Sequence, residues 1–301
     1  METEIRFQPR DLANHILHRP RTECIFVGAG DSYAAALAVQ MVSRTQALSC
    51  HPLDLIDTPT IARGKNVYLI SISGRTSANV KAAKAVRKFA RRIIAVTASP
   101  HSPLAVICDG LTNLEYRSSG VTTSGTNSFT ASLITCLSLA VKTRLPREVG
   151  SLLRRAERDA RIGADCMTWA RGAFYLLGDG ILFPIALYGS LKLNEVLGAK
   201  AFAYSAEEFG HSPIFSARRN DGIIILGRDT DSSAILEQKL KTERLNVARI
   251  SAPGQSEIDA ILYTTFFVQM FAVSIARQRG IKDCYFLKKK SLLEASSDLI
   301  Y

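Results

Sequence analysis

The chain has 301 residues, of which 47% are hydrophobic, and its 38 lysines and arginines outnumber its 27 aspartates and glutamates to give a formal net charge of +11. That length suffices for roughly two domains of about 150 residues each, and the apolar content excludes a disordered chain and a disulfide-stapled miniprotein. The six cysteines stand singly, without a C-x-x-C pair or a cluster with histidine at metal-ligand spacing, so we expect buried thiols in a reducing compartment and no metal site.

The positive charge is dispersed along the chain, without a block of five like charges. We attribute it to solvated faces and to the attraction of anionic substrates. Nucleic-acid binding is not expected, because Arg-rich helices such as residues 154–161 lack interleaved aromatic residues and any known nucleic-acid motif.

The N-terminus is too polar for a secretory signal. The longest apolar stretch, residues 261–276, is interrupted by Thr264, Thr265 and Gln269 and falls short of the roughly 18 to 20 residues that a membrane span needs. The sequence therefore predicts a soluble, cytoplasmic protein with no membrane partner.

Short β-branched or aromatic segments alternate with longer segments of Ala and Leu at helical spacing, a pattern typical of βα units that form a parallel sheet. In the first half, strands are predicted at residues 23–28, 47–52, 66–71, 92–98 and 111–115. Helices are predicted at about residues 31–45, 76–90 and 127–143. The segment 144–150, which contains Pro146 and Gly150, breaks the pattern before a polar helix at about residues 150–171, and we place the domain boundary there.

The pattern then begins again, at an offset of about 150 to 156 residues. A repeat of this length indicates a duplicated domain and not a solenoid. We therefore expect two similar α/β domains, residues 1–147 and residues 148–301, the second ending in a C-terminal tail. The matching segments are 28–37 with 178–187, 66–71 with 222–227, and 95–98 with 248–252.

The first candidate loop runs from Gly28 to Tyr33, between an apolar strand and an Ala-rich helix. A dinucleotide fingerprint would have a third glycine in place of Tyr33 and an acidic residue about 20 residues further on, whereas Asp54 and Asp57 come late. Nicotinamide binding is therefore disfavoured. Gly28 and Gly30 are also explained by a tight turn alone.

The second loop, residues 71–76, follows a buried strand directly and carries the hydroxyls of Ser71, Ser73 and Thr76 with Gly74 among them. Unpaired N–H groups and the positive end of the helix dipole attract an anion at such a helix N-terminus. The loop has the outline of a phosphate site, without the Lys of an NTP-hydrolysing P-loop. An ordinary N-cap is the alternative, but it would need only one hydroxyl.

A third hydroxyl-rich loop, residues 118–126, follows the last strand of the first domain. It contains Thr123 and Ser124, which we take as further candidates for substrate binding. A mobile surface loop is an equal interpretation.

In the second half, Tyr188, Lys192 and Glu195 share one face of a predicted helix, at spacings of four and three. A solvated ion pair is the simplest interpretation. However, His211 follows within 20 residues in a Gly-His-Ser-Pro turn, and lysine, glutamate and histidine together are what proton-transfer chemistry needs.

These segments together resemble the sugar isomerase (SIS) domain family, over about residues 20–280. Within it they are most similar to the tandem-SIS isomerase half of glucosamine-6-phosphate synthase and to the single-chain glucosamine-6-phosphate deaminases. The most specific part is residues 178–213, where Glu195 and His211 are separated by 16 residues as in that family. The resemblance implies two doubly wound, flavodoxin-like parallel-sheet domains in tandem.

The resemblance also implies roles for individual residues. The sugar phosphate would be held by Ser71, Ser73 and Thr76, together with Gly30 and Ser32. Glu195 would be the base that moves a proton between C1 and C2 of the open-chain sugar, with Lys192 beside the substrate oxygens. His211 would assist ring opening from the neighbouring subunit of a homodimer with a shared active site.

The sequence departs from the family pattern at several positions. Ile72 and Arg75 stand where the family has Gln and Glu. The family's C-terminal lysine has no clear counterpart, and Lys288, Lys289 and Lys290 are the candidates to replace it. Because no glutamine-hydrolysing domain with a catalytic N-terminal cysteine is found, glutamine-dependent synthesis is not expected.

The predicted function is therefore aldose/ketose isomerisation of a phosphosugar, with or without release of ammonia from C2, and it needs no cofactor. A phosphoglucose/phosphomannose isomerase and a non-catalytic phosphosugar sensor are the alternatives. The apolar helix at residues 261–276 also favours a homodimer, because its run of large apolar side chains exceeds what one side of a helix can bury within a monomer.

Overall fold

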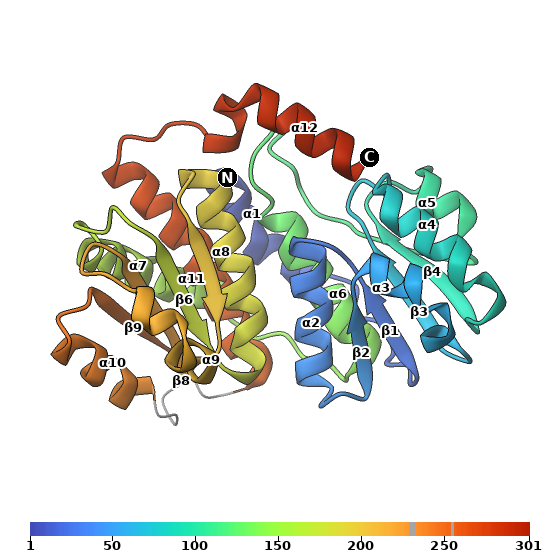
Figure 1. Ribbon diagram of the computed structural model, residues 1–301. Coiled ribbons are helices and arrows are strands. Elements are labelled where there is room, and N and C mark those ends of the chain that lie inside the picture. The colour runs from blue at the N-terminus through green and yellow to red at the C-terminus, as the bar shows by residue number, and fades with distance from the viewer. Residues whose placement is uncertain (229–232, 254–255) are drawn as a thin grey trace. The chain divides into compact units, whose positions relative to one another are not determined.

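The computed structural model describes residues 1–228, 233–253 and 256–301, which form an α/β protein with two parallel sheets (Figure 1). The chain divides into two compact units. The serine-loop unit, named for residues 71–76, consists of residues 14–118, 127–143 and 291–301. The glutamate unit, named for Glu195, consists of residues 1–13, 119–126 and 144–290.

The serine-loop unit contains a five-stranded sheet in the order β2-β1-β3-β4-β5, with every pair parallel. Its strands are β1 (Cys24–Val27), β2 (Ala47–Cys50), β3 (Asn66–Ile70), β4 (Arg92–Thr97) and β5 (Gly110–Asn113). Its helices are α2 (Asp31–Val42), α3 (Pro52–Asp57), η1 (Pro59–Ala62), α4 (Ser77–Ala85), η2 (Val86–Lys88), α5 (Pro103–Ile107), α6 (Asn127–Ala140) and, from residue 291 on, α12 (Lys290–Ile300). All five strands expected in the first half are present.

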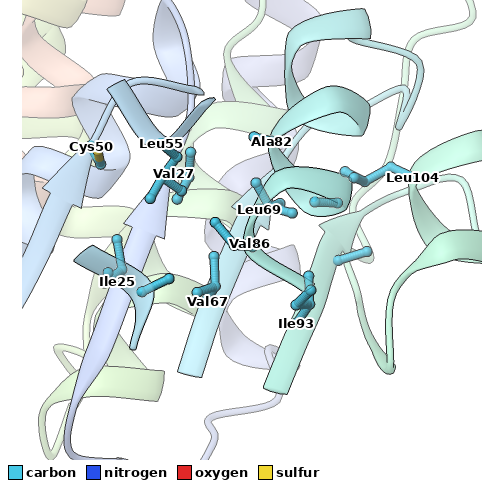
Figure 2. Close-up of a cluster of buried hydrophobic side chains, with 13 residues drawn as sticks. Ile25, Val27, Cys50, Leu55, Val67, Leu69, Ala82, Val86, Ile93 and Leu104 are labelled. Atoms are coloured by element: carbon cyan, nitrogen blue, oxygen red, sulfur yellow. The ribbon is translucent and has the colours of Figure 1, made fainter. Parts of the chain in front are cut away.

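Buried apolar side chains on one face of this sheet form a core beneath α3, α4 and α5 (Figure 2). Those from the central strands come from every second residue, which is the period of a β-strand. The labelled members are Ile25, Val27, Cys50, Val67, Leu69 and Ile93 from the strands and Leu55, Ala82, Val86 and Leu104 from the helices. On the opposite face, Phe26 stacks on Tyr68 with ring centroids 4.8 Å apart, so the central strands are buried on both sides.

The glutamate unit contains a four-stranded parallel sheet in the order β7-β6-β8-β9. Its strands are β6 (Phe174–Gly178), β7 (Ala201–Tyr204), β8 (Gly222–Arg228) and β9 (Val247–Ala252). Its helices are α1 (Glu2–Ala13), α7 (Val149–Cys166), η3 (Gly180–Leu182), α8 (Phe183–Leu197), α9 (Ala206–His211), η4 (Pro213–Ser216), α10 (Ser233–Thr242), α11 (Glu257–Gln278) and η5 (Tyr285–Lys288). This strand order corresponds to that of β2-β1-β3-β4 in the serine-loop unit.

Helix α11 is buried within the chain that carries it. With 22 residues it is long and apolar enough to cross a membrane, but 89% of an apolar 18-residue stretch of this helix is buried inside the protein. It packs against α7 and α8, and Phe266, Phe267, Met270 and Phe271 are each at most 1% exposed. The expectation that this helix presents apolar surface for a second copy is therefore wrong, because one chain buries the helix on all sides.

Candidate active site

A cavity of about 970 Å³ lies at the carboxyl ends of β1 and β3 in the serine-loop unit. The sheet order reverses direction between these two strands, and such a topological switch point is where open α/β sheets bind ligands. The cavity brings together the predicted phosphate-site residues of this unit, although they come from two loops about 40 residues apart. These residues are Gly30, Ser32, Ser71, Ser73 and Thr76.

The loop at residues 71–76 is folded by its own hydroxyls. Ser71 Oγ and Thr76 Oγ1 are 3.0 Å apart, and the backbone N–H of Gly74 donates to Ser71 Oγ at 3.1 Å. Gly74 has a φ of +62°, and a Cβ there would lie 1.9 Å from Ser102 Oγ, so both the turn and the close approach require glycine. The N–H of Arg75 donates to Ser73 Oγ at 3.3 Å.

Thr76 is the N-cap residue of α4, but its side chain makes no capping hydrogen bond to this helix. An ordinary cap would accept from a backbone N–H of the first turn. Its hydroxyl instead lies beside Ser71 on the cavity wall, next to a helix N-terminus that attracts anions. The arrangement suits a phosphate group better than it suits a cap alone.

Sequence reasoning missed several residues of this cavity. Asn79, in the first turn of α4, is 1% exposed and lines the cavity. Its Nδ2 atom donates to the Ile70 carbonyl at 2.9 Å, while its Oδ1 atom has no hydrogen-bond partner among the described residues. A buried acceptor left open in this way can receive a hydroxyl of a bound sugar. His51, at the end of β2, also lines the cavity, and its ring stacks on Tyr33 at 3.7 Å.

The end of helix α12 also lines this cavity, through Leu299, Ile300 and Tyr301. The guanidinium of Arg75 lies 5.3 Å from the centre of the Tyr301 ring, a cation–π contact. The expected C-terminal tail is thus a helix, and Arg75, which departs from the family pattern, contacts it. No periodicity in the sequence links this helix to the serine loop.

In the glutamate unit, helix α8 carries Tyr188, Lys192 and Glu195 together, as their spacing predicted. Lys192 Nζ donates to Glu195 Oε2 at 2.7 Å and lies 5.2 Å from the centre of the Tyr188 ring. Ser124 Oγ donates to the same carboxylate oxygen at 2.5 Å. One oxygen of Glu195 is therefore held by an ammonium group and a hydroxyl.

The burial of this pair differs from that of a surface ion pair. The side chain of Lys192 is 0% exposed, while that of Glu195 is 38% exposed. Burying an ammonium is costly unless it is paired, and the contact with the Glu195 carboxylate offsets part of that cost. The simplest interpretation, a solvated pair, does not hold, and Glu195 keeps access to a ligand from solvent.

The third hydroxyl-rich loop contributes to this cluster. Ser124 is 2% exposed, and its partner is the carboxylate of Glu195. Thr123 lies near the C-terminal segment, with Oγ1 3.6 Å from Cys284 Sγ. The loop segment 119–126 therefore belongs to the glutamate unit and is anchored there by the buried residues Ser124 and Thr126, while residues 120–122 are exposed.

His211 is placed differently from Lys192 and Glu195. It is the last residue of α9, its side chain is 71% exposed, and Nε2 is 3.3 Å from Glu207 Oε1 on the same helix. The three candidate lysines near the C-terminus are also exposed, with Lys289 lying 5.3 Å from the centre of the Tyr285 ring. Tyr285 packs closely on Gly198 at the end of α8, which brings this segment to the helix that carries Glu195.

Among known protein families, the model of the SIS domain matches residues 16–142 of the chain. Among curated relatives, the glutamine–fructose-6-phosphate aminotransferase (isomerizing) of Pyrobaculum aerophilum is 27% identical, with 84% of this chain and 48% of the relative covered. The chain thus spans about half the length of the curated relatives it matches.

Solved structures share the fold over nearly the whole chain. The C-terminal domain of glucosamine-fructose-6-phosphate aminotransferase from Francisella tularensis has a TM-score of 0.72 at 18% identity, covering 94% of this chain and 97% of that domain. A glucosamine-6-phosphate deaminase from Thermotoga maritima has a TM-score of 0.71 at 20% identity, and the match covers 93% of this chain and 92% of the deaminase chain. The α/β architecture with two parallel sheets is therefore a fold that these solved structures share.

Proposed function

We propose that the protein is a phosphosugar aldose/ketose isomerase of the glucosamine-6-phosphate deaminase/isomerase type. The observation that carries the proposal is the position of the Glu195 carboxylate. The buried Lys192 ammonium and the buried Ser124 hydroxyl both donate to it, while the Glu195 side chain stays partly exposed. A positioned carboxylate of this kind is what a proton transfer between adjacent sugar carbons needs. The matches to isomerizing aminotransferases and to a deaminase support the substrate class.

Each unit has its own role in this proposal. In the serine-loop unit, Ser71, Ser73 and Thr76 bind the phosphate with the N-terminus of α4, and Ser32 adds a further hydroxyl. In the glutamate unit, Glu195 removes a proton from C1 or C2 of the open-chain sugar and returns it to the other carbon. No resident cofactor takes part.

Electropositive groups complete the chemistry of the enediol path. Lys192 supplies positive charge beside Glu195, where negative charge develops on the sugar oxygens. His211 assists ring opening, and its exposure on the surface suits a role in the active site of a partner subunit in a homodimer. One lysine of residues 288–290 acts in place of the family's C-terminal lysine.

The proposal extends to the organisation of the whole chain as two SIS domains in tandem, residues 1–147 and 148–301, in a cytoplasmic enzyme. The corresponding strand orders of the two sheets support the duplication. So does the match of this chain to 97% of the C-terminal domain of glucosamine-fructose-6-phosphate aminotransferase from Francisella tularensis.

Incubation of the purified protein in deuterated water tests the function. Glucosamine-6-phosphate, glucose-6-phosphate, and fructose-6-phosphate with ammonia are supplied separately, and deuterium at C2 and product formation are measured. Turnover of the amino sugar with ammonia release is the expected result. Turnover of glucose-6-phosphate alone would identify a phosphoglucose-type isomerase, and tight binding with neither turnover nor exchange would identify a sensor.

A further inference from the structure

The contact between Ser124 and Glu195 joins residues 71 positions apart, and the segment that carries Ser124 has no regular secondary structure. Something else must hold residues 119–126 in place. Helix α1 packs against α7 and α11 in the same unit and buries two polar side chains. Glu4 is 6% exposed and Gln8, one turn later, is 0% exposed.

Glu4 binds both ends of the segment. Its Oε1 atom accepts from the N–H of Ser119 at 3.1 Å and from Ser119 Oγ at 3.0 Å. Its Oε2 atom accepts from Thr126 Oγ1 at 3.4 Å. The Glu4 carboxylate thus accepts all three hydrogen bonds, and a carboxylate has enough lone pairs for them. The first and last residues of the segment are thereby bound to one side chain.

Gln8 holds the segment through a second set of bonds. Its Nε2 donates to Gln269 Oε1 at 2.7 Å, and Gln269 Nε2 donates to the Thr126 carbonyl at 3.3 Å. Gln269 Nε2 also lies 3.1 Å from the Tyr188 hydroxyl, which donates to the Gly125 carbonyl at 2.8 Å. Gly125 immediately follows Ser124, so the two backbone carbonyls after the serine are both fixed.

We propose that Glu4 and Gln8 are positioning residues, through which helix α1 holds Ser124 against the base Glu195. This inference rests on the proposed function. Packing alone does not account for these side chains, because α1 buries Ile5 and Leu12 on the same side, and apolar residues at the positions of Glu4 and Gln8 would avoid the cost of burying polar groups.

Glu4→Gln tests the proposal, because the amide keeps the size of the side chain but replaces one accepting oxygen with an NH₂ group. That group would face the hydrogen-bond donors of Ser119 or Thr126 and could not accept from them. We expect kcat to fall by about 10- to 100-fold, the scale of a small displacement of a catalytic group. KM is expected to stay unchanged, because the phosphate site lies in the other unit. Ser119→Ala, which removes only one of the bonds, should lower kcat in the same direction and less.

Arg6→Ala is the matched control on the same helix. Arg6 forms an ion pair with Glu157 of α7, in which the nitrogen and oxygen atoms are 2.5 Å apart. Its loss weakens the attachment of α1 without removing a bond to residues 119–126. We expect kcat of this variant to remain within about twofold of the parent value. A loss equal to that of Glu4→Gln would show that α1 acts by stability alone and would overturn the proposal.

The double variant Glu4→Gln/Ser124→Ala separates positioning from a general structural effect. If Glu4 acts through Ser124, the double variant is no slower than Ser124→Ala. Fully additive losses would overturn the proposal.

Hydrogen exchange gives a readout that does not depend on turnover. The amides of residues 119–126 should exchange faster in Glu4→Gln than in Arg6→Ala, while those of residues 71–76 stay unchanged. If the parent protein shows no turnover but the exchange is as expected, the proposed function fails and α1 still positions the segment. Unchanged exchange in Glu4→Gln overturns the positioning role whatever the activity.

Discussion

Glu195→Gln replaces one carboxylate oxygen of Glu195 with an amide nitrogen and keeps the length of the side chain, so it removes the proton acceptor while the helix stays intact. General bases contribute about 10²- to 10⁴-fold to a rate, which corresponds to roughly 2.7–5.4 kcal/mol at about 1.36 kcal/mol per factor of ten. We expect kcat and the incorporation of deuterium at C2 to fall together by that factor. Phosphosugar affinity should change little, because the phosphate-site residues lie in the other unit.

The same substitution also affects folding, because Lys192 is 0% exposed and loses its ion pair with the Glu195 carboxylate. Breaking a completely buried ion pair costs about 3–5 kcal/mol. Because the side chain of Glu195 is 38% exposed, we expect about 1.5–3 kcal/mol, the range for a hydrogen bond to a charged group. Urea unfolding of each variant measures this loss, and kinetics must be run where both proteins are folded.

Glu237→Gln is the matched control for the loss of a carboxylate. Glu237 Oε1 is 2.7 Å from Lys241 Nζ, the same N–O distance as in the Lys192–Glu195 pair. This variant should lose stability without losing rate. If the parent protein turns over and Glu195→Gln exchanges deuterium at an equal rate, then Glu195 is not the base, and His211 becomes the next residue to replace.

Three further outcomes are expected. Ser73→Ala/Thr76→Ala should weaken phosphosugar binding by about 1–3 kcal/mol through lost charge-assisted hydrogen bonds, and unchanged affinity in a calorimetric titration would exclude this loop as the phosphate site. The Arg6 guanidinium, which donates hydrogen bonds to Glu157, lowers the pKa of that carboxyl below its ordinary value of 4.5. The ion pair therefore stabilises the fold fully above about pH 4.5, and this stabilisation is lost as the pH falls through the lowered pKa. The difference in unfolding free energy between the parent protein and Arg6→Ala should accordingly disappear in acid. A homodimer is expected by light scattering at micromolar concentration, and a mass of 32.9 kDa would contradict it.

The strands were predictable because central parallel strands are buried on both faces and form nearly continuous apolar runs. Helix α1 was not predicted, because its inward side places Glu4 and Gln8 beside Ile5 and Leu12. A search for apolar residues at helical spacing cannot find a face that buries polar groups. Helix α11 shows the opposite failure: its all-round apolar surface was assigned to a partner, while α7 and α8 of the same chain cover it.

The candidate site was predictable only where its members are neighbours in sequence. The spacing of Lys192 and Glu195 fixes their shared helix face, and the local cluster at residues 71–76 fixes the serine loop. The bond from Ser124 to Glu195 and the open acceptor of Asn79 depend on tertiary packing, which no local pattern encodes. The burial of Lys192 likewise follows from what covers α8 and not from its own sequence.

The distribution of buried polar groups in the glutamate unit bears on the choice between an enzyme and a sensor. Glu4, Gln8, Gln269 and Lys192 are each at most 6% exposed, and their bonds converge on the segment and the helix that hold Glu195. Burying polar side chains is costly even when they are paired, and apolar residues would pack such a unit at lower cost. A sensor that binds phosphate in the serine-loop unit has no need to fix a carboxylate elsewhere. Proton transfer does, since a general base works only when held within reach of the proton it moves.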